Sequence, residues 1–517
     1  MKRFFFLWML LLTWNEISAQ VVVTADFDSG SVGKISCIDS MWLYYAPTDS
    51  VGICTIQLRS RIDPKNPVDP KVWPSSRWFH FRLTGVRNKV VFLHIPNTEM
   101  VRPFFSYDGI RYERFDAKEN LMPQTIQAFF TRDTVYVAYF VPYTHARHLE
   151  RLDAWSRSPF VVRDTIGCSG GGLPVEMITV TDPAVPDSVK KRIWMHARVH
   201  TSEAPASWHL EALVDELTGE SPLAREMRRR AVFFIVPETN PDGVIGGYSR
   251  STPEGVNLEI DWNRPDSLTT PEVLALKRTV GRLAADAPFD VALNLHAQSA
   301  PFVTYWIHSP ESSSEALYRR KMLLSALTIN HTPYYRPVDQ RFSKLDPKYP
   351  EGWFWERFGE RTLAITFETP YTYYNNDPEG RWVSPESLAE LARSSLLALS
   401  DLLDLGGSER LFADTEQAKR RGEWSERRDD RLFWGDSYLV AERRNAKLIF
   451  FFERVPKGTY EIFRWIPGTV AKKFLRQENR WEPLGEVTQR RDGRLVWRYR
   501  ARTQGEVLDA ILLVRKS

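Results

Sequence analysis

Apolar positions in the first third of the chain recur in short runs with a period of two. Such runs occupy residues 41–45, 78–83, 90–95 and 134–140, and turn clusters such as Asp63-Pro64-Lys65-Asn66-Pro67 separate them. A period of two with turns between the runs is typical of antiparallel strands whose loops lie at the surface. We therefore predict an N-terminal β-sandwich domain over residues 20–165.

The pattern changes near residue 170. Continuous apolar runs predict strands that are buried on both faces, at residues 192–199, 231–236, 290–295 and 362–367. Helical periodicity lies between and beyond them, at residues 206–217, 271–285, 313–327 and 385–405. Alternating strands and helices predict an α/β domain over residues 170–407, with a mostly parallel sheet covered by helices.

The last part of the chain returns to short strand-like runs. Gly406-Gly407 ends the last predicted helix, residues 408–431 are rich in charge and predict a linker, and residues 432–517 predict a small C-terminal β domain. Residues 408–517 hold 25 Lys and Arg against 17 Asp and Glu. Because the two signs alternate, we interpret this excess as a solvated surface rather than a polyanion-binding patch, and expect no nucleic-acid partner.

The N-terminus has the features of an export signal. Lys2 and Arg3 precede an apolar run at residues 4–12, and Ile17-Ser18-Ala19 supplies small residues for cleavage. The run is shorter than the roughly 20 apolar residues that span a bilayer, and no later stretch is long enough. We expect residues 1–19 to be removed near Ala19, leaving an exported protein, periplasmic or extracellular, without a stable membrane span.

Composition excludes some classes of protein. Of 517 residues, 43% are hydrophobic and 26% charged, which is too apolar for a disordered chain. The three cysteines leave two interpretations open: a disulfide between Cys37 and Cys54 with Cys168 left over, or three buried thiols. Neither interpretation implies cysteine catalysis.

Two potential metal ligands follow the first apolar run of the α/β domain. His200 and Glu203 lie just past the predicted strand at 192–199, where Pro205 opens a helix. An imidazole and a carboxylate that converge on a turn suit Zn²⁺, with bonds of about 2.0–2.2 Å. His196 is a rival ligand, but four residues along a strand span about 13 Å, so we expect His196 to be structural.

Two more residues obey the same positional rule. His296 follows the predicted strand at 290–295, and Glu368 follows the one at 362–367. Ligands of open α/β sheets bind at the carboxyl ends of strands, so the fold is expected to bring these side chains together. Three protein ligands with an open fourth position describe one catalytic zinc ion, and Glu368 could then take the proton of a water molecule. Arg250 follows the strand at 231–236 as a cation suited to a developing oxyanion.

This constellation resembles the zinc metallocarboxypeptidases, and specifically their cytosolic carboxypeptidase-like branch. The segments that carry the resemblance are residues 197–208, Asn240-Pro241-Asp242-Gly243-Val244, Asn294-Leu295-His296 and Thr366-Phe367-Glu368-Thr369. Residues 78–82 and 140–144 are similar to the N-terminal β-sandwich of that branch, and the likeness covers about residues 26–400. It implies His200, Glu203 and His296 as zinc ligands, Glu368 as the catalytic glutamate and Arg250 as the oxyanion arginine.

One position departs from the pattern of the family. Members usually follow Gly-Val-Asp/Asn-Leu with Asn-Arg, which holds the free C-terminal carboxylate of the substrate, whereas this chain has Glu259-Ile260. Asn263 and Arg264, four residues later, are the candidates for substrate binding in their place. Asn257 stands where many relatives have an aspartate and is expected to orient a ligand histidine.

Three functional hypotheses follow. The first is an exported zinc metallocarboxypeptidase that hydrolyses peptide bonds in a peptide or protein substrate. The second is a zinc amidase that acts on cell-wall or side-chain-linked peptides without a carboxylate clamp. The third is an inactive binding protein whose β units recognise a surface polymer. The substrate, the role of the C-terminal β domain and the oligomeric state stay open.

Overall fold

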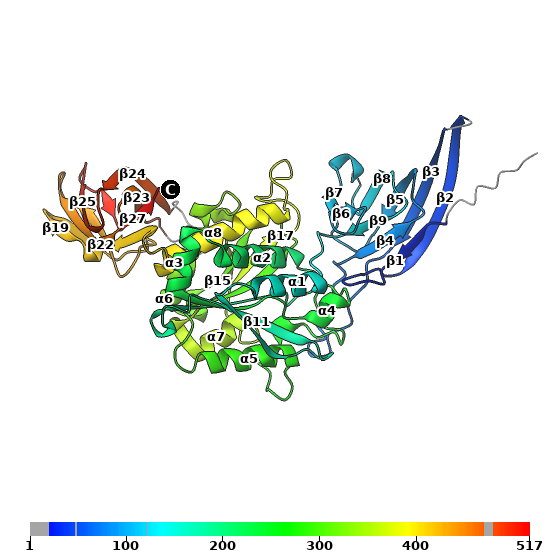
Figure 1. Ribbon diagram of the computed structural model, residues 1–517, viewed down its shortest axis with the longest axis horizontal. Coiled ribbons are helices and arrows are strands. Elements are labelled where there is room, and N and C mark those ends of the chain that lie inside the picture. Colours follow the sequence, from blue (N-terminus) through cyan, green and yellow to red (C-terminus); the bar gives the residue numbers. More distant parts are fainter. Residues whose placement is uncertain (1–19, 47–48, 121, 470–478, 517) are drawn as a thin grey trace, which may run out of the picture. The chain divides into compact units, whose positions relative to one another are not determined.

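The computed structural model describes residues 20–46, 49–120, 122–469 and 479–516, so the predicted signal peptide lies outside the described residues. The chain divides into two compact units (Figure 1). The first consists of the described residues up to Arg61 and of Phe79–Tyr139, and the second of Ile62–Trp78 and the described residues from Phe140 onward. The stretch Ile62–Trp78, from the predicted N-terminal domain, thus belongs by its contacts to the second unit.

The first unit consists of two β-sheets. Strand β8 (Thr125–Phe130), which was not among the predicted runs, buries Ile126, Ala128 and Phe130 and turns the residues between them outward, with the same period of two that predicted strands elsewhere in this domain. One sheet has the order β1 (Val22–Thr24), β4 (His80–Thr84), β9 (Val135–Ala138), β6 (Phe104–Ser106), β7 (Glu113–Arg114). The other has the order β2 (Ile35–Ala46), β3 (Asp49–Leu58), β5 (Lys89–His94), β8, with β3 and β5 parallel.

Neither interpretation of the cysteines is right. Cys37, Cys54 and Cys168 are all free, and only Cys54 is buried. Cys37 and Cys54 lie on paired strands, but Cys37 is opposite Gln57 and Cys54 is opposite Ser40. This register separates the two thiols by several residues along the hairpin.

The second unit contains a mixed eight-stranded sheet whose four central strands are parallel, as predicted. Antiparallel strands at both edges complete it. Its order is β10 (Val161–Cys168), β11 (Pro174–Val180), β13 (Ala231–Val236), β12 (Lys191–Ala197), β14 (Val291–Gln298), β17 (Leu363–Pro370), β15 (Thr304–His308), β16 (Arg341–Ser343).

Helices cover both faces of this sheet (Figure 1). On one face lie α2 (Ala204–Thr218), α6 (Glu315–His331) and α8 (Pro385–Leu403), and on the other α5 (Pro271–Leu283) and α7 (Pro350–Phe358). Large aromatic side chains fill the space beneath α5 and α7, among them Trp194, Trp262, Phe289, Trp353 and Phe354. Further helices of this unit are α1 (His145–Trp155), α3 (Pro222–Arg230) and α4 (Pro241–Ile245).

The C-terminal part forms further antiparallel sheets around a core of its own. Their orders are β18 (Arg410–Asp414), β27 (Ala510–Arg515), β23 (Gly458–Ile466), β24 (Arg480–Gln489); then β19 (Lys419–Arg421), β22 (Lys447–Val455), β25 (Gly493–Arg500); and β20 (Trp424–Arg427), β21 (Tyr438–Ala441), β26 (Val507–Leu508). Residues 408–431, expected as a charged linker, therefore contain three strands. In β19 and β20 charged side chains concealed the strand pattern, because exposed strands carry charge on the outward face.

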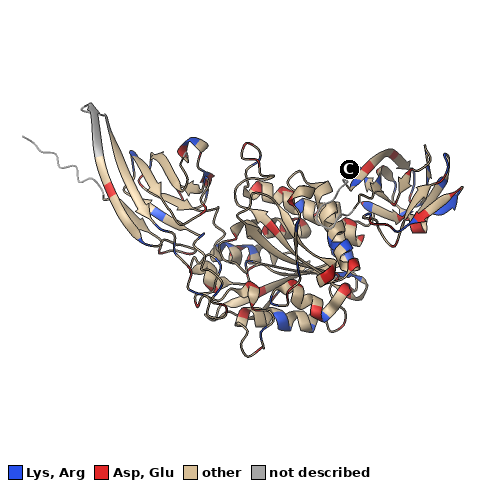
Figure 2. Ribbon diagram, turned by 180° about the vertical axis from the view of Figure 1, so that it is seen from behind, with Lys and Arg blue, Asp and Glu red and all other residues tan. Residues whose placement is uncertain are grey.

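Cations and acids are interspersed over these C-terminal strands (Figure 2). Many of them form ion pairs: Arg420 with Glu426, Arg464 with Glu482 and Glu506, Arg494 with Glu453, and Lys516 with Glu486. Such pairing favours a solvated surface over a continuous polyanion-binding patch. Within the described ranges, no helix combines the length and the apolar character needed to cross a membrane.

Candidate metal centre

An unusual turn presents the first two candidate ligands. After β12, Arg198 has a left-handed backbone with φ of 58°, although it is not a glycine. Its buried guanidinium donates to the carbonyl oxygens of Tyr143 and Thr201 at 3.0 and 2.8 Å and to Ser207 Oγ at 3.0 Å. These bonds hold the turn, so His200 is directed across the carboxyl edge of the sheet.

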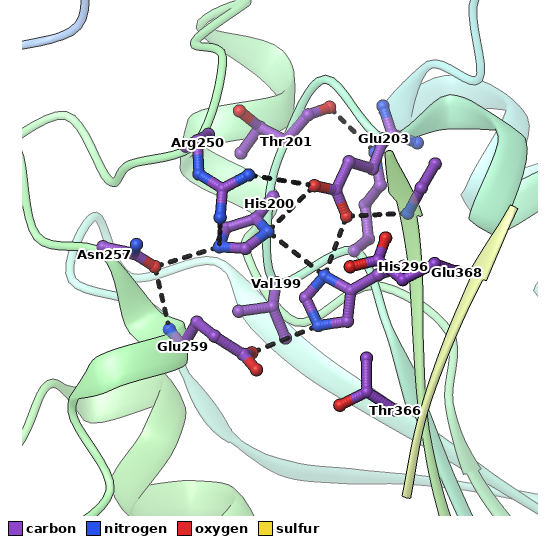
Figure 3. Close-up of polar contacts among 12 residues, drawn as sticks. Val199, His200, Thr201, Glu203, Arg250, Asn257, Glu259, His296, Thr366 and Glu368 are labelled. Carbon is purple, nitrogen blue, oxygen red and sulfur yellow. Dashed lines mark hydrogen bonds and ion pairs between the residues drawn. The ribbon is translucent and has the colours of Figure 1, made fainter. Parts of the chain in front are cut away.

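The three candidate ligands converge on one point (Figure 3). Glu203 Oε1 lies 2.9 Å from His200 Nδ1, and Glu203 Oε2 lies 2.8 Å from His296 Nδ1. The two Nδ1 atoms are 3.1 Å apart, and all three residues are buried. Donors about 3 Å apart from one another fit around one ion with bonds of about 2.1 Å, so the residues fit a zinc ion.

One short segment contacts the Nε2 atoms of both imidazoles, which are the ring nitrogens away from the convergence point. It consists of the 3₁₀ turn Leu258–Ile260 and of Asn257, the residue before the turn. His200 Nε2 lies 3.0 Å from Asn257 Oδ1, and His296 Nε2 lies 3.1 Å from Glu259 Oε2. A hydrogen bond from each Nε2–H fixes the tautomer and leaves the Nδ1 lone pair for a metal. Both histidines are thus oriented as metal ligands.

Arg250 contacts the same cluster. Its Nη1 lies 3.3 Å from Glu203 Oε1, and its Nη2 lies 2.9 Å from His200 Nε2. Nε2 cannot both donate to Asn257 and accept from Arg250, because a neutral imidazole nitrogen has one of these roles at a time. A metal on Nδ1 requires the bond to Asn257, which frees the guanidinium of Arg250 to turn toward a substrate.

The charges of the three ligands are complementary. Burial acts to raise the pKa of Glu203, but His200 and His296 outweigh it and hold the pKa well below its usual range. Burial lowers the pKa of His200 to about 4, with Arg250 adding to the shift. Burial also acts to lower the pKa of His296, but Glu259 and Glu203 outweigh it and raise the pKa well above its usual range. Two carboxylates around one imidazole show that this centre favours a cation.

Glu368 lies beside His296 on the neighbouring parallel strand, in direct register with it (Figure 3). Burial raises the pKa of its carboxyl group to about 7, against the opposing effect of His296. Glu368 Oε1 accepts a hydrogen bond from Trp306 Nε1 at 3.3 Å, and Oε2 has no hydrogen-bond partner among the described residues. A carboxylate with one oxygen anchored and the other unpartnered suits proton transfer.

The strand ends differ from the predictions. His296 and Glu368 were expected to follow their strands, but β14 continues to Gln298 and β17 to Pro370, so both residues lie within strands. Strands β14 and β17 pair from Val291 with Leu363 to Gln298 with Pro370. This pairing makes both strands longer than the apolar runs predicted. Strand ends that depend on the partner strand are not visible in one segment of sequence.

The two candidate substrate-binding residues, Asn263 and Arg264, have different contacts from the candidate metal ligands. Arg264 Nη1 forms an ion pair with Asp261 at 2.9 Å, and Asn263 is exposed. In the described part of the chain, neither residue forms a hydrogen bond or ion pair with the three candidate ligands, whereas Glu259 contacts His296 and also accepts from Asn294 Nδ2 at 3.0 Å. The position that departs from the family pattern thus supports a ligand histidine.

Asp63 is a site residue that the sequence did not reveal. Its buried carboxylate accepts three backbone N–H bonds from the loop of Arg250: from Ser249 at 2.8 Å, Arg250 at 2.7 Å and Ser251 at 3.2 Å. Hydrogen bonds to a charged group are stronger than neutral ones. Asp63 therefore positions Arg250 from a turn cluster 187 residues away in sequence, for which no local signal exists.

Replacing Asp63 by Ala is expected to destabilise the conformation of the loop that carries Arg250. Three buried N–H groups lose their acceptor, so we expect a loss of about 3 kcal/mol in unfolding free energy and of about 10²-fold in kcat with a smaller change in KM, because displaced catalytic groups act on the transition state. Asp63→Asn should recover part of kcat. Asp69→Ala is the control, because among the described residues the Asp69 carboxylate accepts only one hydrogen bond, from the exposed Lys71 N–H. Equal kcat values for the Asp63 and Asp69 variants would disprove the positioning role.

Comparison with known proteins agrees with this geometry. Residues 150–354 match the zinc carboxypeptidase family. An uncharacterized protein of Zymomonas mobilis is 25% identical over 348 residues, which is 63% of this chain and 88% of that protein. Mouse cytosolic carboxypeptidase 6 is 29% identical over 191 residues, which is 36% of this chain and 35% of that protein. The chain thus spans about a third of the length of this cytosolic carboxypeptidase.

Solved structures extend the likeness to the fold. A metallo-carboxypeptidase from Burkholderia cenocepacia superposes with a TM-score of 0.61 at 26% identity, covering 74% of this chain and 99% of that one. A putative carboxypeptidase from Burkholderia mallei gives a TM-score of 0.58 at 25% identity, covering 74% and 97%. Family match, fold and converging ligands agree, so residues 150–354 of this chain belong to a zinc carboxypeptidase domain.

Proposed function

We propose that this protein is an exported zinc-dependent peptidase that removes C-terminal residues from peptides or proteins. The observation that carries the proposal is the convergence of His200, Glu203 and His296, with Glu368 in register beside them. A buried site with two imidazoles and one carboxylate is a common ligand set of catalytic zinc, which keeps a fourth position open. Export rests on residues 1–19, and the cytosolic location in the names of relatives belongs to those proteins.

The chain's own residues divide the work of hydrolysis. One zinc ion, when bound, supplies Lewis-acid chemistry and lowers the pKa of water. Glu368 accepts the proton of the attacking water and passes it to the leaving amine. Arg250, fixed through its backbone by Asp63, donates to the oxyanion that forms at the scissile carbonyl. Asn257 and Glu259 keep the two imidazoles in the tautomer that binds metal.

A second candidate keeps the chemistry and changes the substrate. Glu259 occupies the place of the family's clamp asparagine, and Ile260 that of its arginine, while Arg264 pairs with Asp261. A carboxylate at this place repels a free C-terminal carboxylate rather than binding it. This observation favours a zinc amidase that cleaves peptides whose terminal carboxylate is blocked or absent, such as cell-wall or side-chain-linked peptides.

One digest separates the two candidates. A peptide library and its C-terminally amidated copies are incubated with the protein, and the products are read by mass spectrometry. Carboxypeptidase action gives ladders shortened from free C-termini only, whereas an amidase cleaves both forms at equal rates. Chelation should stop either activity and zinc should restore it, because water is activated at the metal. Cleavage that persists in chelator would refute the zinc mechanism.

A further inference from the structure

One sheet of the C-terminal part departs from the charge pairing of its neighbours. Strands β19, β22 and β25 lie side by side (Figure 1) and hold eight cations and one acid, Glu453. Glu453 is paired with Arg494 at 2.9 Å, and Arg420 is paired with Glu426 of β20 at 3.2 Å. The other six cations of these strands have no ion pair in the described part of the chain. This sheet therefore carries positive charge without matching acids.

The unpaired cations gather on the face of the sheet that points away from the core. Leu448, Phe450 and Tyr499 belong to the core of the C-terminal part. Side chains alternate along a strand, and residues in register on neighbouring strands share a face, so the residues between these three point outward. Five exposed cations occupy such outward positions: Lys419, Arg421, Lys447, Arg498 and Arg500. We call these five residues the cationic face.

Three cations of this face stand directly opposite one another. Lys447 of β22 is in register with Arg421 of β19 on one side and with Arg500 of β25 on the other. Like charges directly opposite each other on neighbouring strands destabilise a sheet. Among the described residues, only Arg500 of the three has a side-chain hydrogen bond, to Asn445 Oδ1 at 2.8 Å. Because sequences depart from such pairing rules mainly at functional sites, the row indicates a negatively charged partner.

A shallow hollow adjoins this row. Its lining contains four cations, Arg421, Arg443, Arg444 and Lys447, and one acid, Glu423, which is paired with Arg443 at 2.9 Å. The hollow has a volume of about 360 Å³. Arginine and lysine side chains bind phosphate oxygens through charge-assisted hydrogen bonds. A phosphate group is therefore a ligand of complementary charge for the hollow.

Apolar side chains lie among the cations. Ile449 is in register between Lys419 and Arg498, and it is only 7% exposed although it points away from the core. The methylene stems of long cationic side chains cover such a residue while their charged ends stay in water. Phe451, two residues further along β22, is 37% exposed. The face therefore combines positive charge with an exposed aromatic edge.

This combination distinguishes among anionic partners. Single-stranded nucleic acids bind by tracking a groove and stacking bases on open aromatic rings. The ring of Phe451 is not open for stacking, because the guanidinium carbon of Arg494 lies 4.4 Å from its centroid. The cations spread over three strands instead of following one line. A membrane surface matches this layout, because it presents phosphates in two dimensions above an apolar layer.

We propose that the cationic face binds the surface of a membrane that contains anionic lipids. A headgroup phosphate occupies the hollow beside Arg421 and Lys447, and Phe451 lies at the level of the headgroups. The C-terminal part thereby keeps the protein at a membrane surface through charge and a small apolar contact. This role goes beyond the proposed hydrolysis and does not depend on the zinc centre.

Neutralising three cations of the face tests the proposal. The face variant carries Arg421→Gln, Lys447→Gln and Arg498→Gln, whose side chains are exposed and have no hydrogen bond or ion pair to lose within the described ranges. Because these changes also relieve repulsion between opposite cations, the Tm of the variant should stay unchanged or rise. A fall in membrane binding therefore cannot come from unfolding.

The matched control removes the same charge from the α/β domain. It neutralises three exposed cations of α5 and α8 that also lack an ion pair in the part of the chain that the structure describes: Arg278, Arg282 and Arg393. Binding is measured by cosedimentation with vesicles made of equal amounts of phosphatidylcholine and phosphatidylglycerol. The zinc-loaded chain from Gln20 onward is used, because it lacks the apolar residues 4–12 that could insert by themselves.

The unmutated protein and the control should bind these vesicles equally, and the face variant about 10²-fold more weakly. Each cation near an anionic membrane contributes about fivefold in affinity. Raising the ionic strength from about 0.1 M to about 1 M shortens the screening length from about 10 Å to about 3 Å and should release the protein. Vesicles of phosphatidylcholine alone should bind little. Equal binding of the face variant and the unmutated protein would overturn the proposal.

Other anions serve as competing probes. A rise in Tm with inorganic phosphate, without binding to the vesicles, would assign the hollow to a free anion and overturn the membrane surface as its partner. Tighter binding of a single-stranded oligonucleotide than of the vesicles would overturn it in favour of a polymer. Hydrolysis of a peptide in solution should be the same for the face variant and the control, so a failure of the proposed peptidase function is distinguishable from a failure of membrane binding.

Discussion

Replacing Glu368 by Gln should lower kcat for peptide hydrolysis by about 10³-fold or more while zinc content and Tm stay unchanged. The loss of a general base and acid costs about 10²–10⁴-fold, and in the proposed mechanism Glu368 performs both steps. The amide oxygen of Gln can still accept from Trp306 Nε1, so the side chain keeps its anchor. Steady-state kinetics, metal analysis and thermal unfolding of the same preparation measure these quantities.

The pH profile gives a further readout of this variant. Glu368 must be ionised to accept a proton, and burial raises its pKa to about 7, a value that the charge of bound zinc lowers. In the unmutated enzyme kcat/KM should therefore fall as the pH drops through this pKa, and the residual activity of Glu368→Gln should lack that acid limb.

Glu272→Gln is the matched control for Glu368→Gln. Glu272 is also a buried glutamate with a pKa raised by burial; one of its oxygens accepts from Gly170 N and the other has no partner within the described ranges. It lies on α5, outside the candidate metal centre. Full activity in Glu272→Gln with near-complete loss in Glu368→Gln would separate catalysis from general effects of neutralising a buried acid. Comparable kcat values for the two variants would exclude Glu368 as the base.

The catalytic fold was predictable from sequence because its strands are buried on both faces. Strand β13 coincides with the predicted run at residues 231–236, where every side chain is buried. The positional rule for carboxyl ends of parallel strands then selected His200, His296 and Glu368 before any distance was known. Residues 408–431 were misassigned because charged edge strands such as β19, which is fully exposed, lack an apolar pattern.

Contacts between distant segments account for what the sequence could not reveal. Asp63 lies in a turn cluster that resembles an ordinary loop, and only the folded chain brings its carboxylate to the Arg250 loop. Glu259 was visible as a departure from the family pattern, but its bond to His296 depends on the side-chain direction of a 3₁₀ turn. Local sequence patterns predict helices, strands and the residues near the ends of strands. Long-range hydrogen bonds determine which polar side chain orients another one, and these bonds form only in the folded chain.

Replacing His296 by Ala should reduce bound zinc from one ion per chain to almost none and abolish hydrolysis. His296 is one of the three proposed zinc ligands, and its loss leaves Glu203 and Glu259 as two buried acids without the imidazole between them. The expected fall in zinc affinity is well beyond the 10–100-fold that loss of an outer hydrogen-bond partner costs. Glu259→Ala removes such a partner and should fall within that smaller range, so competition with a calibrated chelator ranks the two variants.

His196→Ala is the control that links this result to the geometry of the sheet. His196 is a buried histidine of β12, its Nδ1 accepts from Trp194 Nε1 at 3.0 Å, and it is not among the residues whose ligand atoms converge. Its removal leaves a cavity, which lowers Tm, but all three ligands remain, so zinc should stay at one ion per chain. Full zinc occupancy in His296→Ala would mean that the ion is held elsewhere, and then neither Glu368 nor Arg250 would lie beside the metal that activates water.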